Sequence, residues 1–245
     1  MGCYRRTRQF LETIGTLRHL SFASQIRVDF ADAQGGRDAL VCPAALGSPL
    51  HLAAGVLGLR GLSLADKWGL RRLDVSLRGF QKGGVPAELD RLTVRQWLNG
   101  LGQSRRIQER LFDPIALGAL NDDPAVAAAT GFAQVLQEAF YRDVDSTRLG
   151  LATVGLSELY TTAAREYVQS HCGGSVRTGA KVAEVLEAGG RATGARLEDG
   201  ETHMAEHVVS ALAPWELRKL KLPGALRGAW EELQPSPIVS ISIWL

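Results

Sequence analysis

The sequence has few cysteines, and it lacks the long apolar run that a membrane-spanning helix requires. Its three cysteines, Cys3, Cys42 and Cys172, are an odd number and no two lie close together, so they do not indicate a disulfide framework. No signal-peptide pattern opens the chain, and no stretch of about 18 consecutive apolar residues occurs. We therefore expect a protein of the reducing cytoplasm that does not span a bilayer.

The sequence also lacks a strong net charge. The formal net charge is +2 over 245 residues, which gives no global electrostatic reason to expect a nucleic-acid partner. Arginines cluster locally at residues 5–8 and 71–78, as is typical of solvated helix faces or of a surface that touches an anionic partner. Because no aromatic residues interleave with them, we expect no nucleic-acid binding.

Several motifs of known chemistry are absent. There is no G-x-x-x-x-G-K-[ST] phosphate loop, and no G-x-G-x-x-G follows a strand, so the chain carries no dinucleotide fingerprint of its own. Ser157 lies in "GLSEL" and not in a G-x-S-x-G elbow. His203 and His207 have no carboxylate at a ligand spacing, so we expect no metal site. Motifs therefore leave the catalytic residues unknown.

The first 42 residues predict a helix followed by a β-hairpin. In "YRRTRQFLETIGTL", Phe10, Ile14 and Leu17 fall on one helical stripe with Leu11 beside it. Alternating apolar residues in "SQIRVDFAD" predict a strand, "QGGRD" predicts a turn, and "ALVCP" predicts the returning strand.

Residues 43–141 predict a set of short to medium helices joined by tight caps. The spaced glycines at 55, 58 and 61 lie in a Leu-rich sequence with a helical pattern, and they predict close packing or a break between helices. Four N-terminal capping signals are present, two of the capping-box type and two in which proline follows an aspartate. They are Ser63 with Asp66, Thr93 with Gln96, Asp113 with Pro114, and Asp123 with Pro124.

The pattern changes near residue 150 from helices to short strands. One amphipathic helix is expected in "GLSELYTTAAREYVQSHCGG", ended by Gly173 or Gly174. Strands are expected in "SVRTG", "KVAEVLEAGG", "ATGARLEDGET" and "EHVVSALAP", with turns at 189–190 and 199–200. A helical piece is expected at "PWELRKLKL". The final "SPIVSISIWL" reads as a buried strand without a neighbour, so we expect a chain that is cut short.

The strand region resembles a recurring segment of FAD-dependent amine oxidases and phytoene-type desaturases. The matching features are Gly155-Leu156 at the start of the helix, Val182, the two hairpin turns, and the run Val208–Ala211 with Pro214. Where that superfamily often has two prolines, this chain has Ala213-Pro214.

The resemblance implies an FAD cofactor and three residues that contact it. The strand that contains Val182 would present backbone groups to the adenine end, and the small Ala211, followed by Pro214, would let the chain pass close to the cofactor. On spacing alone, a plain antiparallel hairpin layer without a cofactor remains the alternative.

The rest of the chain resembles one branch of that superfamily. "GCYRRTRQFLETIGT", "PLHLAAGVLGLRGLSLADK", "TVRQWLNGLGQS", "LFDPIALGALN" and "TVGLSELY" are similar to segments of the squalene-associated FAD-dependent desaturases, better described as hydroxysqualene dehydroxylases. The resemblance implies the reductive removal of a hydroxyl from hydroxysqualene to give squalene, in squalene and hopanoid biosynthesis. In that family a glycine-rich βαβ unit would precede Gly2 and a closing FAD-binding segment would follow Leu245. We therefore expect a fragment that is inactive alone.

The resulting fold class is α+β. Residues 1–150 are expected to form a mostly helical substrate-binding cap with a short N-terminal hairpin, and residues 151–245 a partial FAD-binding domain of the amine-oxidase type, truncated at its C-terminus. The resemblance assigns "LFDPIALGALN" to the wall of an apolar tunnel. Phe112, Ile115, Leu117 and Leu120 are the candidate substrate contacts, with an ordinary core role as the alternative for each.

The expected partner is an apolar isoprenoid, and a peripheral contact with the inner face of a membrane is a second expectation. Residues 46–64 are apolar but are interrupted by His51 and Arg60, so this segment would lie in the interface; a buried helix pair is the alternative. Two further functions stay open, a carotenoid-type desaturase or amine oxidase relative, and a non-catalytic lipid-binding or scaffold protein. The oligomeric state is not indicated.

Overall fold

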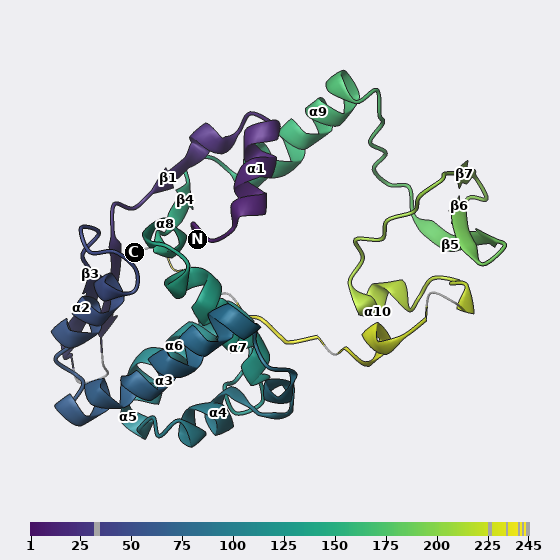
Figure 1. Cartoon of the computed structure of the whole chain (residues 1–245). Coiled ribbons are helices and arrows are strands. Elements are labelled where there is room, and N and C mark those ends of the chain that lie inside the picture. Colours follow the sequence, from purple (N-terminus) through teal and green to yellow (C-terminus); the bar gives the residue numbers. More distant parts are fainter. Residues whose placement is uncertain (32–34, 225–226, 234, 240, 242, 244–245) are drawn as a thin grey trace. The chain divides into compact units, whose positions relative to one another are not determined.

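The computed structural model describes residues 1–31, 35–224, 227–233, 235–239, 241 and 243 (Figure 1). By their contacts these residues form two compact units, Met1–His171 and Cys172–Leu245. Helices dominate the first unit, and both units contain small antiparallel sheets. The α+β fold class is therefore confirmed.

The helix that follows residue 150 packs within the first unit. The Thr16 hydroxyl donates a hydrogen bond of 2.8 Å to the carbonyl of Leu159, and the ring of Phe10 stacks on that of Tyr160 with 6.4 Å between centroids. The compact unit consequently extends to His171. The functional boundary expected at residue 150 stays a prediction.

The first unit begins with a helix and two small sheets. The elements are α1 (Arg5–Thr13), η1 (Leu17–His19), β1 (Leu20–Phe22), β2 (Ile26–Ala31), β3 (Arg37–Cys42) and β4 (Gly150–Ala152). β2 and β3 form the predicted hairpin, in antiparallel register from Ile26 opposite Cys42 to Ala31 opposite Arg37. β1 pairs with β4, which lies more than a hundred residues later in the chain. The predicted stripe is wrong in part, because α1 ends at Thr13 and both Ile14 and Leu17 lie beyond it.

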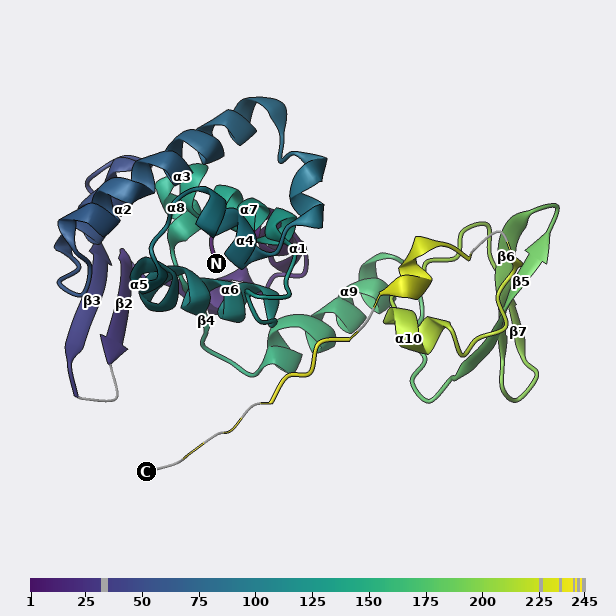
Figure 2. The same ribbon diagram turned by 90° about the horizontal axis from the view of Figure 1, so that it is seen from below.

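The helices of the first unit follow the hairpin. They are α2 (Leu50–Gly58), α3 (Leu64–Gly83), η2 (Ala87–Arg91), α4 (Val94–Gly100), α5 (Arg105–Ile107), η3 (Gln108–Phe112), α6 (Asp113–Leu120), α7 (Ala129–Leu136), η4 (Gln137–Tyr141), α8 (Val144–Thr147), η5 (Ser157–Thr162) and α9 (Ala163–His171). Figures 1 and 2 show α2 beside β3. A Cβ on Gly55 would lie 2.6 Å from Cys42 Sγ, so the predicted close packing at this glycine is confirmed.

The core of the first unit is an aromatic and aliphatic cluster between α4, η3 and α7. Phe132 is completely buried, and its ring meets Trp97 and Phe112 edge to face, with centroids 6.5 and 6.3 Å apart. Leu98, Ile107 and many smaller apolar side chains complete the cluster. Edge-to-face pairs and apolar burial both stabilise such a cluster.

Two of the four predicted caps are confirmed. The side chains of Ser63 and Thr93 each accept a hydrogen bond from the backbone N–H three residues later. In return, the side chains of Asp66 and Gln96 accept one from the backbone N–H of the cap residue. These are complete capping boxes.

The two aspartate–proline caps are wrong. Asp113 lies inside a continuous helical segment because η3 already precedes it, and its carboxylate pairs with Arg95 at 3.3 Å. Asp123 accepts a hydrogen bond from the Ala125 backbone N–H at 2.8 Å within a turn, and α7 begins only at Ala129. In both cases the aspartate carboxylate bonds to a group other than the N-terminal backbone of the helix that it was expected to cap.

The second unit is a three-stranded antiparallel sheet with short helices. Its elements are β5 (Val182–Ala188), β6 (Arg191–Leu197), β7 (Thr202–Met204), α10 (Pro214–Leu217) and η7 (Ala229–Glu232), and the sheet order is β5-β6-β7. Gly189, Gly190 and Gly200 occupy the two predicted hairpin turns with positive φ values of 59°, 77° and 90°. Glycine adopts this conformation without the steric cost of a side chain.

Three predicted strands are wrong in the described part of the chain. Residues 175–179 and 206–214 form no strand, and Val209 is 91% exposed. In the final stretch, residues 236–239, 241 and 243 form no strand and their apolar side chains are exposed; residues 240, 242, 244 and 245 lie outside the described residues. A strand forms only where a partner edge is available, and the outer edge of β5 is bridged by Lys221.

Candidate functional site

The first unit contains an apolar cavity of about 320 Å³ that is partly open to solvent. Its walls come from α2, α3, the η3–α6 segment and the α7–η4 segment. The apolar and aromatic lining residues are Leu40, Pro49, Leu50, Leu52, Ala53, Val56, Leu57, Leu70, Leu73, Leu77, Leu111, Phe112, Ile115, Leu136, Phe140 and Tyr141. The volume lies at the lower end of the range of small-molecule sites, roughly 300–1,000 Å³.

Helical periodicity explains how these elements can line a cavity and still pack on their neighbours. On α3, Leu70, Leu73 and Leu77 recur at spacings of three and four and share one face. On α2, Gly55 faces β3, while Leu50 and Leu57 belong to the cavity wall. The absence of a side chain at Gly55 lets the hairpin support α2 from the side opposite its exposed leucines.

One part of the wall is polar. Tyr141 Oη donates a hydrogen bond of 2.9 Å to Asp74 Oδ1, and Arg78 Nε donates one of 2.8 Å to Asp74 Oδ2. Burial, followed by the proximity of the Asp74 charge, raises the pKa of Tyr141 well above its usual value. The phenol is therefore protonated at neutral pH, and its proton is committed to Asp74.

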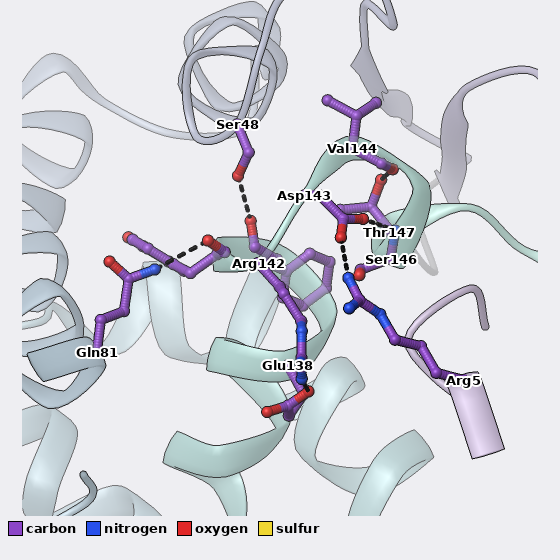
Figure 3. A network of polar contacts seen from close by, with 11 residues as sticks. Arg5, Ser48, Gln81, Glu138, Arg142, Asp143, Val144, Ser146 and Thr147 are labelled. Carbon is purple, nitrogen blue, oxygen red and sulfur yellow. Dashed lines mark hydrogen bonds and ion pairs between the residues drawn. The ribbon is translucent and has the colours of Figure 1, made fainter.

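The backbone that carries Phe140 and Tyr141 is fixed by side chains from distant elements (Figure 3). The Ser48 hydroxyl donates to the carbonyl of Phe140 at 3.1 Å, and Gln81 Nε2 donates to the carbonyl of Tyr141 at 2.9 Å. Both carbonyls lie at the end of a helical segment, where no further turn supplies a partner. The two side chains thus fix the position of this wall of the cavity.

The next helix is anchored to α1 in the same region. Asp143 caps α8 by accepting a hydrogen bond of 2.7 Å from the backbone N–H of Ser146, and Arg5 forms an ion pair with its carboxylate. These contacts lower the pKa of Asp143 although burial opposes them. The end of η4 is therefore held on both sides.

Basic side chains surround the polar part of the wall. Lys67 and Arg71 line the cavity together with Arg78. Lys67 Nζ donates to the carbonyl of Leu57 at 2.8 Å, and the Arg71 guanidinium lies 4.3 Å from the centroid of the Trp68 ring. Among the described residues that line the cavity, Asp74 is the only carboxylate, so the local charge favours a neutral or anionic ligand over a cationic one.

The four substrate residues expected from the sequence lie in different environments. Phe112 and Ile115 line the cavity. Leu117 is 50% exposed and Leu120 packs on the core, and neither belongs to the cavity lining as described. Their role in substrate binding stays a prediction.

Sequence reasoning missed the polar group formed by Tyr141, Asp74 and Arg78. The spacing of Asp74 and Arg78 is a readable i,i+4 pair on a helix. Tyr141 lies 67 residues after Asp74, and no local pattern brings these two side chains together.

The three expected FAD contacts all lie in the second unit. Val182 is half-buried at the start of β5, opposite Leu197. Ala211 is exposed, and Pro214 is the first residue of α10. In the described structure, residues 206–211 form neither helix nor strand and are mostly exposed. This open backbone, with only a methyl group at Ala211, is compatible with a ligand that approaches the main chain closely.

The described residues contain no cluster of His, Cys, Asp and Glu arranged to hold a metal ion. Within the same residues, no helix is both long and apolar enough to cross a membrane.

The geometry defines a helical unit with an apolar ligand cavity and a separate antiparallel sheet unit. A family model described as flavin containing amine oxidoreductase matches residues 1–243. The chain therefore belongs to the flavin-containing amine oxidoreductases, a family of FAD-dependent oxidoreductases. The curated proteins include no match to the chain.

Proposed function

We propose that this chain is part of an FAD-dependent oxidoreductase that acts on an apolar isoprenoid, and that it removes the hydroxyl of hydroxysqualene to give squalene. The observation that carries the proposal is the cavity of the first unit, whose walls are apolar except for the group of Tyr141, Asp74 and Arg78 and the neighbouring Lys67 and Arg71. The sequence resemblance to hydroxysqualene dehydroxylases supplies the particular substrate.

An isoprenoid offers almost no hydrogen-bonding groups, so its affinity must come from buried area. Each Å² of apolar surface removed from water contributes about 25 cal/mol, before the cost of ordering the chain. Walls of leucine, isoleucine and phenylalanine provide such area. Since the cavity is partly open, a long chain can extend beyond it.

An amine substrate is the less favourable alternative within the family. A protonated amine entering the cavity would meet Lys67, Arg71 and Arg78. The Asp74 carboxylate, which could balance such a charge, already accepts hydrogen bonds from Tyr141 and Arg78. A neutral isoprenoid avoids both costs.

For the cofactor, the residues of this chain that would contribute are Val182, Ala211 and Pro214. A bound flavin in its reduced form would supply the hydride that replaces the hydroxyl group and would itself become oxidised. The C–O bond breaks, a C–H bond forms, and the oxygen leaves as water after gaining a proton. The apolar walls keep bulk water from the reacting carbon.

We further propose that the α2–α3 face binds the surface of an anionic membrane. This face consists of exposed apolar side chains with basic neighbours. The residues are Leu50, Leu57, Leu64, Trp68, Lys67, Arg71 and Arg72. Several of them also line the cavity, so a lipid-dissolved substrate would enter from the bilayer side. His51, which interrupts the apolar sequence of this segment, is itself buried.

Membrane binding is tested with vesicles. Flotation with phosphatidylglycerol vesicles should recover the wild-type protein, and Trp68→Ser should reduce the recovery several-fold because the 69% exposed indole is lost from the face. Trp215→Ser, in the second unit, is the matched control and should float like the wild type. Equal flotation of both variants would contradict the proposal.

The reaction is tested with the complete gene product, FAD and a reductant. Hydroxysqualene should be converted to squalene, which is measured by gas chromatography. Ile115→Ala should lower kcat/KM about tenfold or more by removing cavity contacts. Val126→Ala, at a 68% exposed side chain outside the cavity lining, should have less than a twofold effect. Conversion of a phytoene-like lipid without formation of squalene would favour the desaturase function. A protein that never shows flavin absorbance would favour a non-catalytic lipid-binding role.

A further inference from the structure

The polar group of the cavity has a defined hydrogen-bond polarity. A phenol has one O–H donor and two acceptor lone pairs. The Tyr141 proton is directed at Asp74 Oδ1 at 2.9 Å, and the second oxygen of Asp74 accepts from Arg78 at 2.8 Å. The lone pairs of Tyr141 Oη remain able to accept a hydrogen bond from a ligand, and the Asp74 carboxylate, which also lines the cavity, is the neighbouring acceptor.

We propose that Tyr141, held by Asp74, binds the hydroxyl group of an apolar alcohol and thereby determines which part of a long isoprenoid occupies the cavity. The ligand hydroxyl donates its proton to Tyr141 Oη. The surrounding walls of α2, α3 and α6 hold the hydrocarbon chain. This inference rests on the proposed role of the cavity as the substrate site.

The arrangement discriminates between ligands by their hydrogen-bond donors. An alcohol has an O–H to donate, whereas a methyl ether or a hydrocarbon of the same length does not. Since the Tyr141 proton is already committed to Asp74, an ether oxygen finds no donor at Tyr141. Tyr141 is thus a specificity-determining residue, and Asp74 is the positioning residue that sets the direction of its O–H group.

Backbone contacts position Tyr141 independently of its hydroxyl. Gln81 Nε2 bonds its carbonyl, and Gln137 Nε2, from the same helical segment, donates to the carbonyl of Leu77 at 2.9 Å. Replacement of Tyr141 by phenylalanine keeps the ring and these backbone contacts. The variant Tyr141→Phe therefore removes the acceptor with little change in the shape of the wall.

The test is a binding experiment on the complete chain without added flavin or reductant. Farnesol, farnesyl methyl ether and farnesene compete against an environment-sensitive apolar dye. The wild type should bind farnesol about five to ten times more tightly than the ether or the hydrocarbon, as expected for one hydrogen bond in an apolar site. Because Tyr141→Phe alone frees Asp74 Oδ1 to accept the alcohol proton, the double variant Tyr141→Phe/Asp74→Ala is used, and it should bind all three with the affinity of the hydrocarbon.

Two further variants separate a role in specificity from a structural one. Tyr160→Phe, whose ring stacks on Phe10, is the matched control and should keep the preference for farnesol. Asp74→Ala should lose the preference for farnesol over its ether although the phenol remains, because the Tyr141 O–H is then free to donate to the ether oxygen. If the double variant does not fold, as judged by circular dichroism, Asp74→Ala and the wild-type ligand series carry the test.

Three results would overturn the inference. The first is equal binding of farnesol and its ether by the wild type. The second is an unchanged preference for farnesol in Tyr141→Phe/Asp74→Ala. The third is an equal fall in affinity for all three ligands in that double variant. A tighter binding of farnesoic acid than of farnesol would assign selectivity to Lys67, Arg71 and Arg78 instead. Because no redox step is involved, failure to produce squalene would leave the result of this experiment unaffected.

Discussion

Replacing Asp66 by asparagine should loosen the junction between α3 and α5. The Asp66 carboxylate is buried and accepts hydrogen bonds from three donors. The Ser63 backbone N–H and hydroxyl lie 2.9 and 2.7 Å from Oδ2, and the Ser104 hydroxyl donates to Oδ1. Ser104 is itself the N-cap of α5, where it accepts from the N–H of Ile107. One carboxylate therefore joins the N-termini of two helices.

The size of the effect follows from these contacts. Loss of a hydrogen bond to a charged acceptor lowers the free energy of unfolding by roughly 1.5–3 kcal/mol. Loss of an N-terminal cap lowers it by roughly 0.5–2 kcal/mol. In Asp66→Asn one amide oxygen remains, while the other acceptor becomes a donor that faces either Ser63 or Ser104. We expect the free energy of unfolding to fall by about 2 kcal/mol at neutral pH.

The effect should also depend on pH. The hydrogen bonds from Ser104 and then Ser63 lower the pKa of Asp66 below its usual value of 3.8. A carboxylate with a lowered pKa stabilises the folded state fully above the pKa of the unfolded chain and loses this contribution as the pH falls through the folded value. The difference between wild type and variant should therefore shrink when the pH falls below about 3.8.

The assay is urea denaturation followed by far-ultraviolet circular dichroism at pH 7 and at acidic pH. Asp145→Asn is the matched control, because its side chain is 71% exposed and forms an ion pair with Arg148, three residues later in the chain. It should change the stability by less than about 0.5 kcal/mol. If Asp66→Asn were as mild as this control, or if its effect were constant with pH, the junction described above would not stabilise the fold.

The remaining predictions concern packing, reactivity and titration near α2. Gly55→Ala should destabilise the folded protein by about 1–3 kcal/mol, because the added Cβ would lie 2.6 Å from Cys42 Sγ. A Cβ on Gly58 would meet no atom within 4 Å, so Gly58→Ala should be neutral or stabilising in thermal melts. Burial raises the pKa of the Cys42 thiol to about 11. Iodoacetamide should therefore label the exposed Cys172 in the native protein, and Cys42 only after unfolding. Rapid labelling of Cys42 in the native protein would contradict its burial. Burial also lowers the pKa of His51 below 6.5, so the stability should decline as the pH falls below 6.5, and His51→Leu should flatten this decline.

The elements that the sequence predicted correctly depend on contacts between residues close in the chain. The capping boxes at Ser63 and Thr93 and the glycine turns at 189–190 and 200 each involve a few consecutive residues. The alternation in β2 likewise needs only the neighbouring β3. Such features are determined by short-range hydrogen bonding and by backbone sterics.

The wrong predictions at Asp113 and in the strand segments concern features that depend on a distant partner. Asp113 was expected to cap a helix, yet Arg95 is its partner and η3 continues into α6. Residues 206–214 have the apolar composition of a strand, but in the described structure no sheet edge pairs with them. Composition gives a segment the tendency to form a strand, but the strand forms only where the edge of a sheet is available to pair with it.

The sequence by itself determined the family, the α+β class and the apolar character of the helical unit. Only the tertiary structure decided which apolar residues face the cavity, with Phe112 and Ile115 in its wall and Leu117 exposed. It alone also brought Tyr141 to Asp74 across 67 residues. The physical reason is that composition and spacing are properties of the chain, whereas a cavity wall and its polar contacts exist only once several helices have packed together.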